Sequence, residues 1–167
     1  MRIILFRHGI AIDRDDPASP GEEDRFLTDE GIEKTRAAAS GLARLGVTPD
    51  RVISSPWLRA RQTAEIAAEA LGFDAGRIEL SDALLPFSPA SALLELVSVP
   101  ASREVLVTGH APHLDEALFA LTEASAVRIK KAGAAGIEIL DHHFSSGRLE
   151  WFMPPRALRE LGAGTAR

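Results

Sequence analysis

The feature that most constrains the fold is the alternation of short apolar runs with longer helix-like segments. The three apolar runs are too short for helices and are typical of buried strands; they span Arg2 to Arg7, Arg51 to Ser54 and Glu104 to Thr108. The helix-like segments run from Thr28, as a cap, to near Gly46, from Pro56 to Gly72, from Ala90 to Val97 and from Pro112 to Leu121. Strands separated by helices imply a mostly parallel sheet that is covered on both faces.

The last third of the chain departs from this alternation. Strands are expected there over Val127 to Lys130, Ala134 to Leu140 and Leu149 to Met153, and the last two are joined across Asp141 to Gly147. A closing hairpin predicts an antiparallel edge. The predicted fold class is therefore α/β, a three-layer sandwich with a mostly parallel central sheet, helices on both faces and an antiparallel edge. A length of 167 residues fits one domain over 1–167.

Composition excludes several classes of function. The chain has no cysteine, which removes disulfides, thiolate metal sites and cysteine nucleophiles. The net charge is −5, with acids concentrated in a predicted loop over Asp13 to Asp24, and no basic face suggests a nucleic-acid partner. The apolar run Ile3 to Phe6 is too short for a signal-peptide core or a membrane span. We expect a cytoplasmic protein without a membrane partner, either a monomer or a weak oligomer.

Histidine and arginine side chains follow the predicted strands where these strands end. Arg7, His8 and Gly9 close the first strand, and His110 follows the third. Arg59 lies one turn into the helix after the second strand. Because ligands of open α/β sheets bind outside the carboxyl ends of the strands, we expect these residues to meet in one crevice.

The expected cluster suits a doubly charged oxyanion. Two guanidinium groups and two imidazoles would surround it, and arginine matches phosphate by its planar bidentate geometry. Gly9 lets the backbone approach closely. No cysteine is present, and the Asp-x-Asp sequence at Asp13 falls well past the strand, so an imidazole nitrogen remains as nucleophile. The attacking ring must be neutral at one nitrogen, and a hydrogen bond from its other nitrogen to a carbonyl would hold that tautomer.

Four segments, in this order, resemble the motifs of the histidine phosphatase superfamily. They read Arg7-His8-Gly9, Leu27-Thr28-Asp29-Glu30-Gly31, Ser55-Pro56-Trp57-Leu58-Arg59-Ala60-Arg61-Gln62-Thr63-Ala64 and Gly109-His110-Ala111-Pro112. The small size and the wording of the third motif are most similar to the SixA-type phosphohistidine phosphatase branch. The similarity covers nearly the whole chain.

The resemblance implies a role for each matching residue. His8 matches the nucleophile that becomes phosphorylated, and Arg7 and Arg59 match guanidinium clamps. His110 matches a second pocket histidine that stabilises the transferring oxygens, and Arg25 matches an arginine that lines the same pocket. Neither a metal nor a cofactor is implied, since these cations neutralise the phosphoryl charge. The implied substrate-binding set is Arg7, Gly9, Arg25, Arg59 and His110.

One position departs from the family pattern. Larger members carry a carboxylic acid that protonates the leaving group, where this chain has Ala83, and Asp82 is only its neighbour. An alkoxide leaving group has a conjugate acid of pKa about 15.7, whereas imidazole has one of about 6.5. A site without a strong acid therefore favours phosphohistidine in a protein domain as substrate. The alternatives are a phosphomonoesterase acting on a small metabolite or phosphoserine, and a non-catalytic phosphate-binding module.

Simpler interpretations stay open for several cations. Arg25 has a solvated position as its alternative. Arg59 has a surface ion pair with Glu65 or another acid as its alternative, although Arg61 fits that role better. Lys130-Lys131 is interpreted as a charge pair at a strand end or as a guide for an acidic partner.

Overall fold

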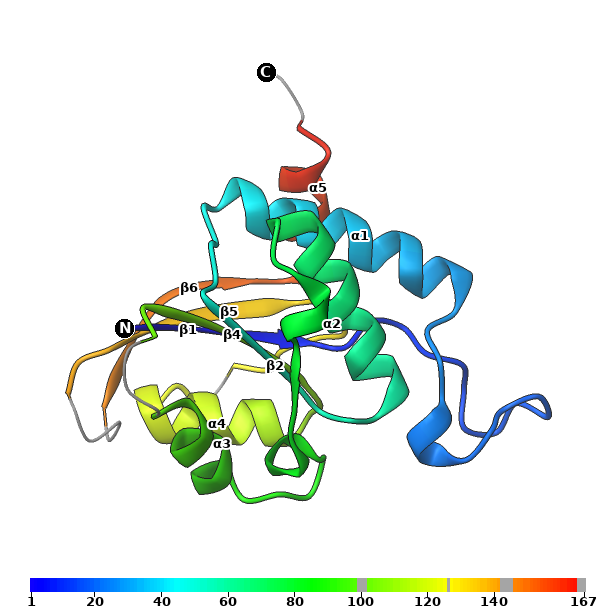
Figure 1. Cartoon of the computed structure of the whole chain (residues 1–167), viewed down its shortest axis with the longest axis horizontal. Coiled ribbons are helices and arrows are strands. Elements are labelled where there is room, and N and C mark those ends of the chain that lie inside the picture. The colour runs from blue at the N-terminus through cyan, green and yellow to red at the C-terminus, as the bar shows by residue number, and fades with distance from the viewer. Residues whose placement is uncertain (99–101, 126, 142–145, 165–167) are drawn as a thin grey trace.

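The computed structural model describes residues 1–98, 102–125, 127–141 and 146–164. Its strands form one sheet with the order β3-β2-β4-β1-β5-β6 (Figure 1). Strands β1 to β4 pair in parallel, whereas β5 runs antiparallel to both β1 and β6. The strands are β1 (Arg2–Arg7), β2 (Arg51–Ser54), β3 (Glu79–Leu80), β4 (Glu104–Gly109), β5 (Ala134–Ile139) and β6 (Gly147–Met153). The predicted α/β class, with an antiparallel edge on a mostly parallel sheet, is confirmed.

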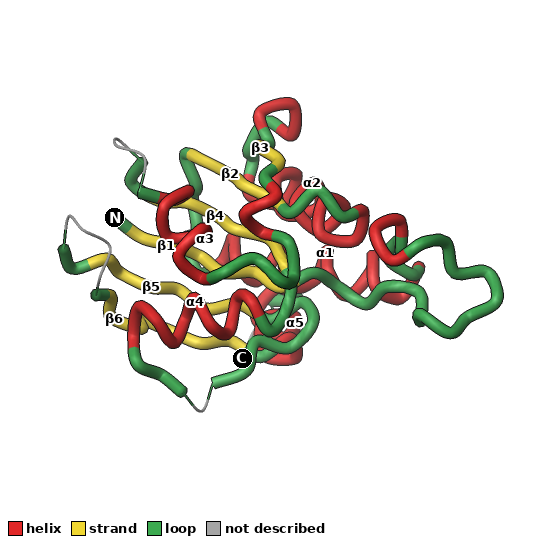
Figure 2. The backbone as a smooth tube through the Cα atoms, turned by 90° about the horizontal axis from the view of Figure 1, so that it is seen from below, coloured by secondary structure: helices red, strands yellow, loops and turns green. Residues whose placement is uncertain are grey.

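Helices cover both faces of this sheet. One face carries α1 (Asp29–Arg44), α2 (Leu58–Leu71) and α5 (Pro155–Gly162). Figure 2 shows the other face, crossed by α3 (Ala90–Val97) and α4 (His113–Thr122). No helix of the described residues has the length and apolar character needed to cross a membrane.

Two apolar clusters form the core, one on each side of the sheet. Strand β1 contributes to both because successive side chains of a strand point to opposite faces. Ile3 and Leu5 pack with α3 and α4, whereas Ile4 and Phe6 pack with α1, α2 and α5. All four side chains are fully buried. This double burial explains why the first strand reads as a continuous apolar run.

The helix boundaries follow local capping. Thr28 caps α1 as expected, since its Oγ1 accepts a hydrogen bond of 3.0 Å from the Gly31 N–H. Helix α2 begins at Leu58 rather than at the predicted Pro56, because Trp57 keeps an extended backbone (φ −62°, ψ 132°). This later start places Arg59 in the first turn of α2.

Three elements differ from the sequence prediction. Val127 to Lys130 is not a strand, because side chains bind its backbone: Ile129 N–H donates to Asp115 Oδ1 (2.8 Å), and Ile129 O accepts from Arg7 (2.9 Å). Strand β3 was not predicted, since its two residues are exposed and show no apolar run. Helix α5 was not predicted either. Its position depends on the tertiary packing of Leu158 against α1.

Gly31 allows the first turn of α1 to pack against the segment that follows β1. A Cβ at Gly31 would lie 1.9 Å from the carbonyl oxygen of Ile10, which backbone atoms cannot easily vacate. We expect Gly31→Ala to lower the free energy of unfolding by about 1–3 kcal/mol, as overpacking does. Chemical denaturation measures this loss. The control is Gly21→Ala, whose Cβ would meet nothing within 4 Å; equal stability of the two variants would contradict the prediction.

Candidate active site

The two pocket histidines leave neighbouring parallel strands at the same level. Arg7, the last residue of β1, pairs in register with Gly109, the last residue of β4. His8 and His110 are therefore the next residues of each strand, and their ring centroids lie 5.1 Å apart. The two residues are only 6% and 2% exposed. The expectation that separate strand ends bring these side chains together agrees with this geometry.

A backbone carbonyl holds the tautomer of His8. Its Nδ1 lies 2.7 Å from the Gly9 oxygen, which can only accept, so Nδ1 carries the proton and Nε2 keeps its lone pair. Burial holds the pKa of His8 well below its usual value, and the neighbouring His110, Arg59 and Arg7 lower this pKa further. The ring is therefore neutral at neutral pH, with an Nε2 able to act as a nucleophile.

His110 has one ring nitrogen engaged and one free. Its Nε2 lies 2.9 Å from the Ser55 hydroxyl oxygen, in the segment after β2. Within the described residues its Nδ1 is buried and has no hydrogen-bond partner. The ring of Trp57 packs edge-to-face against the His110 ring, and the two ring centroids lie 5.1 Å apart. Burial lowers the pKa of His110 to about 3, assisted by the positive charges of Arg59 and Arg7, so this ring is neutral as well.

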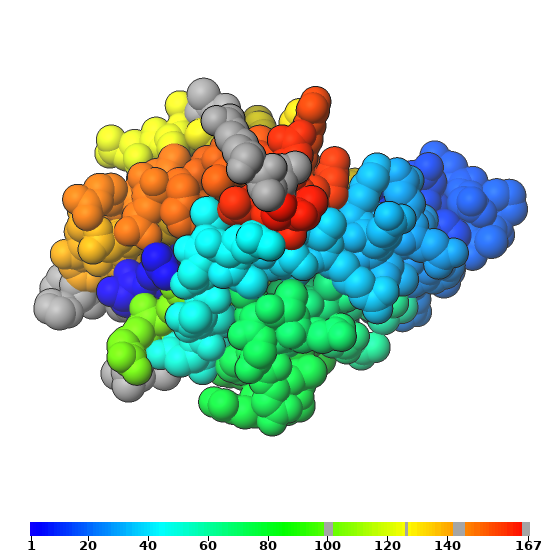
Figure 3. Space-filling model, turned by 90° about the horizontal axis from the view of Figure 1, so that it is seen from above, coloured from blue at the N-terminus to red at the C-terminus, as the bar shows by residue number. Residues whose placement is uncertain are grey.

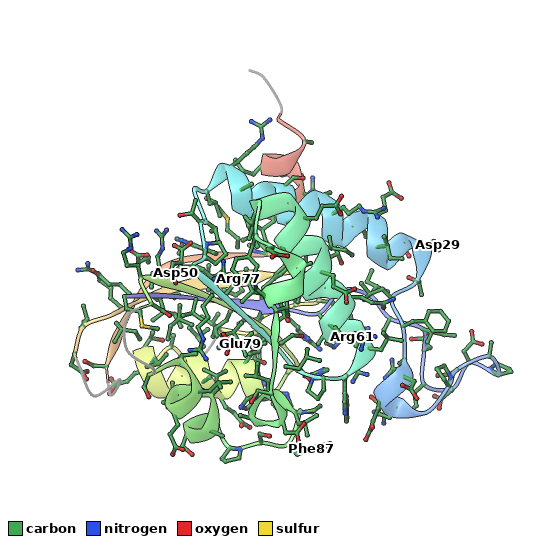
Figure 4. All side chains as sticks on the ribbon, in the orientation of Figure 1. Asp29, Asp50, Arg61, Arg77, Glu79 and Phe87 are labelled. Carbon is green, nitrogen blue, oxygen red and sulfur yellow. The ribbon has the colours of Figure 1, made fainter. Side chains whose placement is uncertain are left out.

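Arg59 lies under the loop that precedes α1. Its side chain is buried, stacks over Trp57 (4.7 Å from its Cζ to the ring centroid), and donates to both the backbone oxygen (2.7 Å) and Oε1 (2.9 Å) of Glu22. Arg59 does pair with an acid, but this acid is Glu22 rather than Glu65, and the guanidinium is buried rather than at the surface. Arg61, at the exposed start of α2 in Figure 4, takes that position, with its Nε 3.7 Å from Glu65 Oε1.

Glu22 is the residue of this region that sequence reasoning missed. Its carboxylate accepts hydrogen bonds from Arg14 (3.0 Å), Arg25 (3.0 and 3.1 Å) and Arg59. Burial acts to raise the pKa of Glu22, but hydrogen bonds from Arg14 and Arg25 outweigh it and hold this pKa below its usual value. The spacing of three residues could have indicated the ion pair between Glu22 and Arg25, whereas nothing in the sequence indicated the contact between Glu22 and Arg59.

Arg25 reaches the cluster through this carboxylate. Its guanidinium binds Glu22 with one nitrogen and donates from Nε to the Ile12 oxygen at 2.9 Å. Arg25 is thus a neighbour of Arg59 across a shared partner, and its side chain is largely buried rather than solvated. These contacts support the prediction that Arg25 lies near the pocket. Its guanidinium, however, is already hydrogen-bonded to Glu22 and to the Ile12 oxygen.

Arg7 and Gly9 complete the group. Arg7 donates to the Ile129 oxygen at 2.9 Å, while its Nε is buried without a hydrogen-bond partner in the described part of the chain. The Gly9 N–H donates to Thr63 Oγ1 on α2 (3.1 Å), and a Cβ on Gly9 would lie 2.1 Å from Thr35 Oγ1 on α1. The glycine therefore serves the close approach of two helices to the segment after His8.

The position at which larger family members carry the acid holds no carboxylate in this structure. Ala83 carries none, and Asp82 is exposed at the start of a short 3-10 helix. Asp82 does line a pocket of about 370 Å³ together with Trp57, Arg61 and the acids Glu23 and Asp24. Asp82 thus shares a pocket with Trp57, whose ring contacts His110 and Arg59.

The low pKa of His110 has a consequence for stability. In the unfolded chain the pKa of this imidazole is about 6.5, whereas in the folded chain it is about 3. Between these two pH values the unfolded chain therefore binds a proton that the folded chain does not bind. From this group alone we expect no change in stability above pH 6.5, and a loss of about 1.4 kcal/mol per pH unit as the pH drops from 6.5 toward 3. We expect His110→Gln to show a shallower loss of unfolding free energy between pH 6 and 4. Parallel profiles of the two proteins in chemical denaturation would contradict this.

Comparisons with known proteins agree with the geometry. The family model of the histidine phosphatase superfamily (branch 1) matches residues 3–85. An uncharacterised protein of Picosynechococcus is 39% identical over 145 residues, which cover 82% of this chain and 84% of that protein. Phosphohistidine phosphatase SixA of Escherichia coli is 29% identical over 163 residues, covering 95% of this chain and 97% of SixA.

The same relationship appears in three dimensions. A structure of the protein histidine phosphatase SixA complexed with tungstate superposes with a TM-score of 0.83 at 26% identity, covering 95% of this chain and 99% of that one. The resemblance of the four motifs is thereby confirmed: the chain is a phosphatase and belongs to the histidine phosphatase superfamily.

Proposed function

We propose that this phosphatase removes the phosphoryl group from phosphohistidine in a protein domain, without a metal or cofactor, through a phospho-His8 intermediate. The observation that carries the proposal is a neutral His8 whose Nδ1 is bonded to Gly9 O and whose ring lies 5.1 Å from that of His110. We further propose that residues 1–167 act as one catalytic domain. The cytoplasmic location and the monomeric or weakly oligomeric state stay predictions from the sequence.

The first step transfers the phosphoryl group to the enzyme. Nε2 of His8 forms a bond to phosphorus while the bond from phosphorus to the substrate's nitrogen breaks. The electron pair of that bond returns to the substrate's ring, which leaves as neutral imidazole because its other ring nitrogen carries a proton. Among the described residues, the Arg7 Nε and the His110 Nδ1 are buried without a hydrogen-bond partner, and these groups are best suited to bind the phosphoryl oxygens. Arg59 has five N–H donors, so contacts with Glu22 leave others for the phosphoryl group.

The second step regenerates the enzyme. A water molecule attacks phosphorus, the bond from phosphorus to Nε2 breaks, and inorganic phosphate leaves. His8 is a good leaving group in this step because its Nδ1–H remains bonded to the Gly9 carbonyl, which returns the ring to its neutral tautomer. The same oxygen-binding groups serve both steps.

The substrate preference follows from the leaving group. An imidazole departs with little assistance, since its conjugate acid has a pKa of about 6.5. An alkoxide needs a proton donor, and Ala83 supplies none. The 29% identity to SixA, a phosphohistidine phosphatase, over almost the whole of both chains also supports this preference.

A phosphomonoesterase is the second candidate, and the observation that favours it is a pocket that Asp82 and Trp57 both line. Turnover of phosphohistidine and of an alkyl phosphate at equal enzyme concentration separates the candidates. We expect faster turnover of phosphohistidine, and we expect Asp82→Asn to change that rate by less than about threefold, because imidazole leaves without an acid. Faster turnover of the alkyl phosphate, abolished by Asp82→Asn, would support the phosphomonoesterase instead.

A further inference from the structure

A basic pocket of about 450 Å³ adjoins the end of β1, in a chain whose net charge is −5. Its walls come from α1, α5 and the turn before β5, and Figure 3 shows α5 (red) seated against α1 (light blue). No carboxylate lines this pocket among the described residues. Its cationic residues are Arg7, Lys34, Lys130, Lys131 and Arg159. Lys34 also pairs with Glu30, outside the pocket lining. Apart from Arg7, these cations take no part in the phosphoryl-transfer steps.

The turn over residues 130–133, called the lysine turn below, is hydrogen-bonded to the backbone of Arg7 and His8. The N–H of Ala132 lies 3.1 Å from the Arg7 oxygen and 3.2 Å from the His8 oxygen. The Gly133 N–H closes the turn by donating to the Lys130 oxygen at 2.7 Å. Ala132 adopts φ 57°, a conformation that a non-glycine residue keeps only when its surroundings hold it there. The backbone that carries Lys130 and Lys131 is therefore anchored to the backbone of Arg7 and His8.

Acidic residues occupy the other side of the site. The pocket toward β2 and β3 is lined by Glu23, Asp24 and Asp82, with Arg61 as its cation. The basic pocket lies toward β5, whose first residue follows the lysine turn. Along the sheet order β3-β2-β4-β1-β5-β6, the histidines after β4 and β1 thus separate an acidic side from a basic side.

We propose that the basic pocket is a subsite for carboxylates of the protein substrate, in the segment next to its phosphohistidine. This inference rests on the proposed function and names the class of substrate. Lysine ammonium groups are compact point charges on flexible stems, which suits several carboxylates along a chain, whereas a lone phosphate is matched better by arginine forks. The apolar surface of Ile10, Ala132 and Pro155 between the cations suits the methylene groups of glutamate.

Two phosphohistidine peptides test the subsite. They are identical except that the residues flanking the phosphohistidine are Glu in one and Gln in the other. At low salt we expect wild-type kcat/KM to be about tenfold higher for the Glu peptide, mainly through KM, and the difference to shrink above about 0.1 M salt, where the screening length is about 10 Å. Equal kcat/KM for the two peptides would overturn the proposal.

A pair of double variants separates local recognition from net charge. We expect Lys130→Ala/Lys131→Ala to lose most of the preference for the Glu peptide. The control, Arg36→Ala/Arg103→Ala, removes the same charge from exposed positions outside the pocket and should keep the preference. A preference that persists in the lysine variant, or that disappears equally in the control, would overturn the proposal.

A competition experiment keeps the subsite distinct from the proposed function. The unphosphorylated Glu peptide should inhibit turnover of an aryl phosphate by the wild-type enzyme and should inhibit the lysine variant less. Such inhibition in an enzyme that does not hydrolyse phosphohistidine would support the subsite and refute the proposed function. Phosphohistidine turnover with no inhibition by the peptide would refute the subsite alone.

Discussion

The His8→Ala variant is expected to lose turnover by a factor on the order of 10⁴ or more, as enzymes do when a covalent nucleophile is removed. It should also take up no phosphoryl label from substrate, because no other described side chain offers a neutral imidazole nitrogen at the same place. The wild-type label should be labile in acid and stable in base, as a phosphoramidate is. Steady-state kinetics and label retention after denaturation measure the two effects.

The control for losing a buried imidazole is His113→Gln. His113 is fully buried at the start of α4, and its Nε2 lies 3.3 Å from the Pro89 oxygen, so its contacts are those of packing. This variant should keep the label. Full turnover in His8→Ala would show that His8 is not the nucleophile. A phosphate-binding module without catalysis would show neither turnover nor label in the wild-type protein.

Arg59→Ala should lower kcat by about 10²–10³, which is the usual effect of removing one donor from a pocket that stabilises developing charge. The buried guanidinium combines a full positive charge with a planar fork. Arg59→Lys should recover part of this loss, since it restores the charge without the fork. Steady-state kinetics with a saturating substrate measures kcat for both variants.

The control for Arg59 is Arg61→Ala, two positions along α2. Arg61 is exposed and its carboxylate partner is Glu65, at 3.7 Å, so we expect kcat to change by less than about threefold. A similarly small change in Arg59→Ala would contradict the assignment of Arg59 to the oxyanion pocket.

Burial on both faces explains which strands could be predicted. Strands β1, β2 and β4 are central, so their sequences are continuous apolar runs. Val127 to Lys130 alternates β-branched and cationic residues, which is typical of a half-buried strand. Asp115 and Arg7 bind its backbone at Ile129 instead, and that choice of partner depends on residues far away in the chain. Strand β3 has two exposed residues and leaves no pattern. Helix α5 does carry a sequence signal, Pro155 at its first position, which the sequence prediction did not use.

The same distinction applies to the site. His8 and His110 could be predicted because each directly follows a buried strand, and parallel pairing brings such residues together. Glu22 could not be predicted, because it lies in a polar loop and its contact with Arg59 spans 37 residues. Local propensity carries no information about a pairing of that kind. It is set by how the loop folds back over the start of α2.

A crystal structure of the chain with bound tungstate or phosphate tests the central claim most directly. We predict one anion with His8 Nε2 about 3–3.5 Å from its central atom, in line for attack. Nitrogens of Arg7, Arg59 and His110 should lie within hydrogen-bond distance of its oxygens. An anion bound elsewhere, or one that touches His8 while His110 and Arg59 face away, would contradict the proposed chemistry.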